Sequence, residues 1–167
     1  MKPSDDRQYA PATQRNREPI LKVLLEVLPP TGTILELSSG TGEHAVFFAP
    51  QLFARKWIPS DPNPIARASI ASWRESEPSE NLARPIEIDV REPIWSIERQ
   101  QLSEPIGAIV NINMIHISPW AACLGLMAGA NRILKPGGIL YLYGPYKQNG
   151  EHTAQSNEQF DRSLQQQ

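Results

Sequence analysis

The sequence has one cysteine, no long apolar run and no cluster of basic residues. With Cys123 alone, the chain cannot form an intramolecular disulfide. No stretch approaches the roughly 18 apolar residues that a membrane span needs, so we expect no membrane partner. The net charge of −2 and the dispersed Lys and Arg residues argue against a nucleic-acid surface. The polar residues 1–7 lack the apolar centre of a signal peptide, which predicts a cytoplasmic protein.

What is present fits one globular domain, because 40% of the 167 residues are hydrophobic and 20% are charged. Residues 1–15 are polar and contain Pro3 and Pro11, so we expect them to form a flexible N-terminal arm. Residues 16–167 contain no internal repeat and no sign of a second domain, which predicts a single core.

Short apolar runs alternate with segments of helical spacing along the chain. Strands are predicted at residues 34–37, 56–61, 85–89, 108–113 and 139–143. Helices are predicted at residues 19–28, 43–53, 63–77, 94–102 and 118–134, with a last helix from residue 156. This alternation is typical of an α/β fold in which helices cover both faces of a parallel sheet.

The predicted helix at residues 118–134 has two further features. Ser118 suits its N-cap position and Pro119 its first helical position. Gly125 and Gly129 lie about one turn apart, which permits close packing against a neighbouring element.

The most informative pattern is in residues 33–44, where an apolar run is followed by a carboxylate, a glycine loop and a helix. Gly40 and Gly42 lack a Cβ atom, which permits positive φ and the close approach of a ligand. The helix that follows would direct its free N–H groups at the same ligand. These features predict a nucleoside-containing cofactor at the loop.

A dinucleotide is one candidate for that cofactor. Residues 40–45 match the pattern G-x-G-x-x-A, and Asp61 follows about 20 residues later, as in nicotinamide oxidoreductases. However, Asp89 adds a carboxylate at the end of the third predicted strand. The fifth predicted strand is also followed by too little sequence for a second mononucleotide-binding half.

A cofactor with one nucleoside and an amino-acid tail accounts for more of the polar residues at the strand ends. Glu36 and the loop backbone would contact the amino-acid part of this cofactor. Asp61 would accept hydrogen bonds from the ribose hydroxyls, and Asp89 from the adenine amine. Asn111 and Asn113 would close the remaining wall. The carboxyl ends of parallel strands share one edge of the sheet, so we expect these side chains to converge there.

With acidic residues after the second and third strands, the glycine loop resembles that of class I S-adenosylmethionine-dependent methyltransferases. The chain is more closely similar to the methyltransferase-like protein 26 family, also called domain of unknown function 938. The similar stretches are residues 10–20, 38–44, 59–62, 113–120 and 142–146. Residues 113–120 are specific to that family. The resemblance implies a Rossmann-like three-layer fold and S-adenosylmethionine as the cofactor.

Two features depart from the family pattern. Ser38 occupies the first glycine position of the general motif, where its side chain would crowd the cofactor's tail. The family also continues into two more strands that complete a seven-stranded sheet. We therefore expect about five parallel strands, a C-terminally incomplete domain and an exposed edge at residues 139–143. That edge could pair with a second subunit in a homodimer.

Four more residues are candidates for the site. Arg15 and Asn16 lie in a stretch shared with the family and are predicted to fold over the cofactor, with Arg15 near its carboxylate. His116 is either a packed histidine bonded to a loop carbonyl or a functional residue, as a general base or as a group that orients the substrate. Tyr146 follows the fifth strand, either as a rim aromatic or as part of the acceptor pocket.

The resulting hypothesis is methyl transfer from S-adenosylmethionine to a small-molecule acceptor, with His116 and Tyr146 as catalytic candidates. The predicted cofactor-binding residues are Arg15, Asn16, Glu36, Ser38, Gly40, Gly42, Asp61, Asp89, Asn111 and Asn113. No metal site is predicted, because no His, Cys and Asp cluster has ligand spacing. The alternatives are a cofactor-binding module without turnover and a nicotinamide-dependent oxidoreductase.

Overall fold

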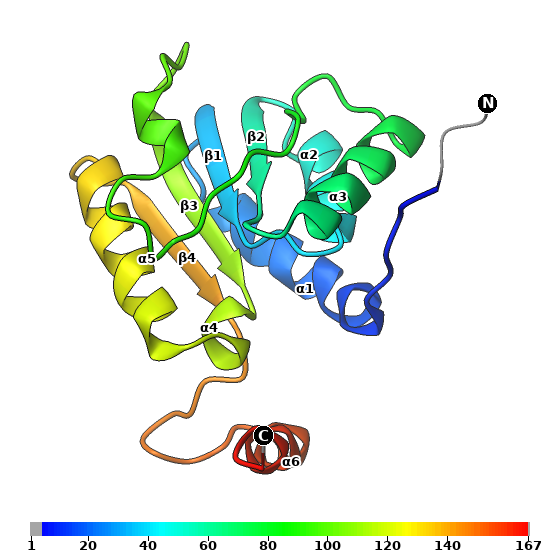
Figure 1. Ribbon diagram of the computed structural model, residues 1–167, viewed down its shortest axis with the longest axis vertical. Coiled ribbons are helices and arrows are strands. Elements are labelled where there is room, and N and C mark those ends of the chain that lie inside the picture. The colour runs from blue at the N-terminus through cyan, green and yellow to red at the C-terminus, as the bar shows by residue number, and fades with distance from the viewer. Residues whose placement is uncertain (1–4, 167) are drawn as a thin grey trace.

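The computed structural model describes residues 5–166, which form an α/β domain with a parallel sheet (Figure 1). The four strands lie in the order β2-β1-β3-β4 and are β1 (Gly32–Leu37), β2 (Arg55–Ser60), β3 (Ile106–Ile112) and β4 (Ile139–Tyr143). The helices are α1 (Pro11–Val27), α2 (Glu43–Gln51), α3 (Pro64–Ser76), α4 (Met114–Ile117), α5 (Trp120–Ile133) and α6 (Gln155–Leu164), with a 3-10 turn at Ser96–Arg99. The predicted fold class is confirmed.

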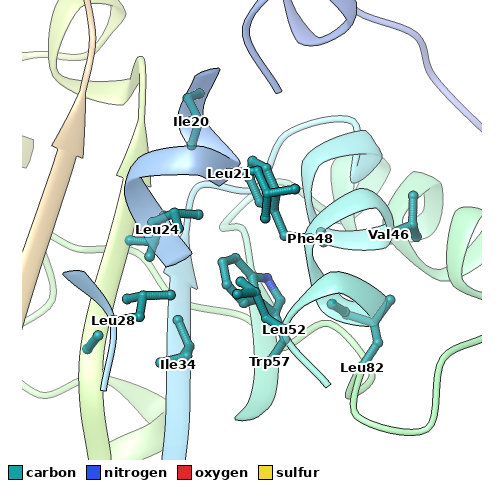
Figure 2. Close-up of a cluster of buried hydrophobic side chains, with 14 of the residues drawn as sticks. Ile20, Leu21, Leu24, Leu28, Ile34, Val46, Phe48, Leu52, Trp57 and Leu82 are labelled. Atoms are coloured by element: carbon teal, nitrogen blue, oxygen red, sulfur yellow. The ribbon is translucent and has the colours of Figure 1, made fainter. Parts of the chain in front are cut away.

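One hydrophobic core lies between the sheet and the helices α1 and α2 (Figure 2). Leu24 of α1 and Phe48 of α2 are fully buried there, and the Phe48 ring packs against the indole of Trp57 from β2. Ile34 of β1 points into the same core. Its neighbour Leu35 points to the opposite face, because successive side chains of a strand alternate between faces.

The second core lies between the other face of the sheet and α5. Gly125 and Gly129 of α5 let the helix approach the segment that contains Val90 and Trp95. A Cβ atom at Gly129 would overlap the Trp95 ring, and one at Gly125 would overlap the carbonyl oxygen of Val90. The predicted close packing at these two glycines is therefore confirmed. Helices on both faces give the three layers expected of this fold class.

The sheet has four strands rather than the expected five, because residues 85–89 do not form a strand. Their segment touches β2 only through isolated bridges, Ser60 with Ile86 and Trp57 with Leu82. Each of the two paired segments contains a proline that interrupts the pairing. Pro59 lies in β2 and Pro85 in the neighbouring segment, and neither has an N–H group to donate.

The first helix begins at Pro11 and not at residue 19, so residues 11–15, expected in a flexible arm, are helical. Pro19 lies inside α1, where burial of Ile20 and Leu24 holds the helix together despite the missing N–H. Residues 5–10 run beside α3, where Ser69 Oγ accepts the Gln8 N–H at 2.8 Å. The first part of the expected arm, residues 1–4, lies outside the described residues.

Residues 118–119 do not begin a helix as expected. Pro119 is the N-cap of α5, and Ser118 ends the preceding single turn α4, which the sequence pattern did not predict. Among residues 5–166, no helix is long and apolar enough to cross a membrane.

We predict that Gly129→Ala destabilises the protein by about 1–3 kcal/mol, because the new methyl group must displace the buried Trp95 ring. Helix propensity alone predicts the opposite sign, a gain of about 1 kcal/mol. Urea unfolding measures the difference. Asn131→Ala on the exposed side of the same helix is the control and should change stability by less than about 0.5 kcal/mol. A stabilised Gly129→Ala variant would contradict the packing described.

Candidate functional site

The loop between β1 and α2 has three residues in the left-handed region within a span of five. The φ angles are 55° at Ser38, 56° at Gly40 and 91° at Gly42. A Cβ atom at Gly42 would lie 2.8 Å from the Cα of Ile70, so this glycine allows α3 to pack against the loop. A Cβ atom at Gly40 would have no neighbour within 4 Å. Gly40 is therefore the point where a ligand could approach the loop backbone.

Ser38 adopts a backbone conformation that non-glycine residues other than Asn and Asp rarely use. The left-handed region costs a residue with a Cβ atom on the order of 1–2 kcal/mol. This cost explains why glycine suits the position in the general motif.

Asp61 connects the end of β2 to the glycine loop. Its Oδ2 accepts the backbone N–H of Gly40 at 3.0 Å, and its Oδ1 accepts that of Asn63 at 2.9 Å. The side chain is buried. Because an ionised carboxylate offers about four lone-pair positions, each oxygen can accept one more hydrogen bond.

Glu36 is only 2% exposed, and its Oε2 accepts the indole N–H of Trp57 at 2.8 Å. Burial, with a smaller effect from the nearby negative charge of Asp61, raises the pKa of the Glu36 carboxyl to about 7. The hydrogen bond from Trp57 opposes this shift. Glu36 is therefore poised between its two protonation states near neutral pH, and a cationic ligand group would favour the charged state.

The other predicted cofactor ligands on the strand ends have partners of their own. Asp89 forms an ion pair with Arg91 at 2.6 Å, and hydrogen bonds from this guanidinium lower the pKa of Asp89. The amide of Asn111 is buried and donates to the carbonyl oxygen of Leu37 at 3.0 Å, which ties β3 to β1. Asn113 is the N-cap of α4 with a φ of 64°, and its backbone N–H donates to the carbonyl oxygen of Tyr143 at 2.8 Å.

A cavity of about 700 Å³ is lined by residues that follow β3, by residues at the end of β4 and by residues of α6. Figure 1 shows α6 beyond the carboxyl ends of these two strands. Four of the predicted site residues line it: Arg15, Asn16, Asn113 and His116. Ser156, Asn157 and Phe160 of α6 also line it, although the sequence analysis assigned them no role. No Asp or Glu is among the described residues that line this cavity.

His116 packs its ring against Tyr146, with the ring centroids 4.5 Å apart. Its Nε2 is buried and has no hydrogen-bond partner within the described part of the chain, so the expected bond to a loop carbonyl is absent at this atom. A Cβ atom at Gly144 would overlap Nε2, so this glycine makes room for the ring. Burial lowers the pKa of His116, which favours the neutral ring that a general base requires.

Tyr146 lines a second cavity of about 270 Å³, which it shares with His116. The loop after β4 is joined to α6 at this cavity, because Asp161 accepts from both Lys147 and His152 at 3.1 Å. Burial raises the pKa of the Tyr146 hydroxyl. Tyr146 therefore remains a neutral hydroxyl at physiological pH.

The predicted site residues thus form two groups. Arg15, Asn16, Asn113 and His116 line the larger cavity, and Tyr146 lies beside it. Glu36, Ser38, Gly40, Gly42 and Asp61 lie in or beside the glycine loop but do not line that cavity. Asp89 and Asn111 engage other protein groups. The structure gathers no cluster of His, Cys, Asp and Glu that could hold a metal ion within residues 5–166.

DUF938, described as a protein of unknown function, matches residues 7–167. The chain belongs to the DUF938 family. This agrees with the resemblance that residues 113–120 carry.

Solved structures with the same fold include several methyltransferases. An O-methyltransferase family protein from Burkholderia thailandensis is 15% identical, with 83% of this chain and 40% of that chain covered and a TM-score of 0.63. A SAM-dependent methyltransferase from Anabaena variabilis is 16% identical, with 78% of this chain and 51% of that chain covered and a TM-score of 0.62. The apo form of SibL, an S-adenosylmethionine-dependent methyltransferase, is 15% identical, with 90% of this chain and 41% of that chain covered and a TM-score of 0.68.

At these identities the likeness concerns the fold, and the DUF938 chain spans only 40% to 51% of the length of these structures. It has the Rossmann-like fold of class I methyltransferases, with fewer strands than their usual seven.

Two residues that hold the N-terminal segment of the DUF938 chain against the site were not predicted. Glu43 is buried, and its Oε2 accepts the N–H of Ala10 at 2.6 Å and the hydroxyl of Thr41 at 3.0 Å. His44 Nε2 lies 2.8 Å from Asn16 Oδ1, and burial lowers the pKa of His44 to about 4. The one available signal was their position in the first turn of the helix that follows the glycine loop.

We predict that the wild-type protein loses stability relative to Glu36→Gln as the pH rises from about 4.5 to about 7. The folded state holds the Glu36 proton more tightly than the unfolded state, so unfolding becomes easier as that proton is lost. The full difference is on the order of 3 kcal/mol. Urea unfolding at several pH values measures it, and Glu80→Gln, an exposed substitution, should follow the wild-type curve. Parallel curves for wild type and Glu36→Gln would contradict the assignment.

Proposed function

We propose that this DUF938 protein binds S-adenosylmethionine at the glycine loop and transfers its methyl group to a small molecule. The observation that carries the proposal is the open space beside Gly40, next to the carboxylate of Asp61. This combination lies at the carboxyl edge of a parallel sheet, where ligands of such folds bind. The fold shared with known methyltransferases supports the same cofactor.

The residues around the loop fit the chemical groups of that cofactor. Asp61 has unused acceptor capacity for the two ribose hydroxyls, since each of its oxygens accepts one hydrogen bond from a backbone N–H group. Glu36 would accept from the ammonium group, which favours its charged form. Asp89 would accept from the adenine amine, and Arg15 would pair with the carboxylate.

The larger cavity is the proposed acceptor site. Its volume of about 700 Å³ lies in the range of small-molecule pockets, roughly 300–1,000 Å³. Arg15 is a cation at its wall, and no carboxylate is among the described residues that line it. With Arg15 paired to the carboxylate of the cofactor, these features favour a neutral acceptor with an apolar part that packs on Phe160.

Bound S-adenosylmethionine would supply a methyl group on a positively charged sulfur. The cavity walls would hold the acceptor in line with that group, which is the main requirement for a displacement of this kind. His116, kept neutral by burial, would take a proton from an acceptor that carries one, after its ring turns from Gly144. Tyr146 would position the His116 ring through their edge contact.

A cofactor-binding module without turnover is the second candidate. The burial of His116 Nε2 favours it, because a base must reach the proton it removes.

Titration calorimetry with S-adenosylhomocysteine tests the binding step. We expect binding to the wild-type protein, weakened by at least about tenfold in Gly40→Ala, whose methyl group would fill the space beside the loop. Gly137→Ala is the matched control, because Gly137 also has positive φ and open surroundings but lies before β4. Equal affinities of the two variants, or a response to NAD alone, would overturn the proposal.

Methyl transfer from labelled S-adenosylmethionine into a small-molecule extract tests the chemical step. We expect His116→Asn to reduce the rate by about 100-fold if the acceptor must lose a proton, while S-adenosylhomocysteine affinity stays unchanged. The wild-type rate should rise with pH as His116 becomes neutral, and the variant should lack this dependence. Wild-type binding without any labelled product would favour the module without turnover.

A further inference from the structure

Residues 7–10, which we call the docked segment, run beside α3 and lead into α1 (Figure 1). The side chains of the segment lie outside both hydrophobic cores, and that of Tyr9 is 64% exposed. Hydrogen bonds of the backbone hold the segment in place instead. The carbonyl oxygen of Gln8 accepts the indole N–H of Trp73 at 2.9 Å, and its N–H donates to Ser69 Oγ at 2.8 Å.

Ser69 of α3 joins the docked segment to the glycine loop. Its hydroxyl accepts the N–H of Gln8 and donates to the carbonyl oxygen of Thr41 at 2.6 Å. Thr41 is the loop residue between Gly40 and Gly42. Because Ser69 is fully buried, water does not compete for either bond while the segment is docked.

Glu43 makes a second link between the same two parts of the chain. Its Oε2 accepts the N–H of Ala10 at 2.6 Å and the hydroxyl of Thr41 at 3.0 Å. The Glu43 side chain is buried as well. The carbonyl and the hydroxyl of Thr41 are therefore both held by side chains that also hold the docked segment.

We propose that Ser69 and Glu43 are positioning residues that make the shape of the glycine loop depend on the docked segment. When the segment leaves, each of the two side chains loses a hydrogen bond and is opened to water, which competes for Thr41. Gly40 adjoins Thr41, so the loop backbone beside the open space loses its fixed position. The effect on cofactor affinity rests on the proposed function, whereas the link between segment and loop does not.

The docked segment also positions one wall of the larger cavity. Ala10 is the N-cap of α1, and Ala12, Arg15 and Asn16 of this helix line the cavity. Docking of the segment thus fixes parts of both the proposed cofactor site and the proposed acceptor site. Because coupling between two equilibria is reciprocal, a cofactor that stabilises the loop also stabilises the docked segment.

Titration calorimetry with S-adenosylhomocysteine tests the effect on binding. Gln8→Pro removes the N–H that Ser69 accepts, since proline has no backbone donor, and it changes no residue of α3 or of the loop. We expect the dissociation constant of this variant to rise by about tenfold. Gln8→Ala is the matched control, because it retains the N–H, and should differ from the wild type by less than about twofold. Equal affinities of the two variants would overturn the proposal.

Two substitutions at Glu43 separate its role as a hydrogen-bond acceptor from its role in folding. Glu43→Gln retains a side-chain oxygen that can accept from Ala10 and Thr41, so we expect an affinity close to that of the wild type. Glu43→Ala removes the acceptor and should raise the dissociation constant by about tenfold or more. Equal losses in the two variants would show that Glu43 does not act as proposed.

Hydrogen exchange without any ligand tests the link independently of the cofactor. In Gln8→Pro we expect faster exchange at the amides of Gly40 and Gly42, whereas the amides of β3 should not change. Unchanged exchange at the two glycines would overturn the proposal, whatever the protein binds. With S-adenosylhomocysteine, the Ala10 amide of the wild type should exchange more slowly. A wild-type protein that binds none of this ligand would refute the proposed function, while the exchange at the two glycines would still decide the link.

Discussion

The hydrogen bond from the Gly40 N–H to Asp61 holds the glycine loop, on which the arrangement of the candidate site depends. A loop with three left-handed residues has no repeating backbone pattern, so its shape needs partners from neighbouring elements. Ser39 adds a second link at the same place, because its N–H donates to the carbonyl of Ser60 at 2.8 Å. These bonds join the ends of β1 and β2. They leave Gly40 open to solvent while the rest of the loop is held in place.

Buried polar groups at this edge have a cost that the two hydrophobic cores must offset. Glu36 is buried with a raised pKa, and only one of its oxygens has the Trp57 indole as a partner. A well-packed apolar side chain would serve stability better at such a position. Groups with strongly shifted pKa values cluster at functional sites, which is why Glu36 is informative. His116 gives a similar signal at the cavity, where its Nε2 lacks a partner.

Much of the fold could be predicted from the sequence, because it depends on local patterns. Apolar runs placed β1, β2, β3 and β4 to within a few residues, and the alternation with helices indicated a parallel sheet. The failures occurred where tertiary contacts override local preference. Pro19 is a helix-starting residue by position, yet burial of its neighbours carries α1 through it. Residues 85–89 have a strand pattern, yet a proline in this segment and one in β2 prevent a continuous series of hydrogen bonds between the two.

The sequence by itself determined the residue types at the strand ends, the positive φ at Gly40 and Gly42 and the membership of the DUF938 family. Only the tertiary structure decided which of these residues meet. Arg15 and His116 share a cavity although about 100 residues separate them, because the first turns of α1 and the single turn α4 both line the cavity that α6 also lines. Asp89, expected to converge with Glu36 and Asp61 at the strand ends, forms an ion pair with Arg91. Spacing along the chain specifies which side chains follow a strand, whereas their partners depend on contacts between distant segments.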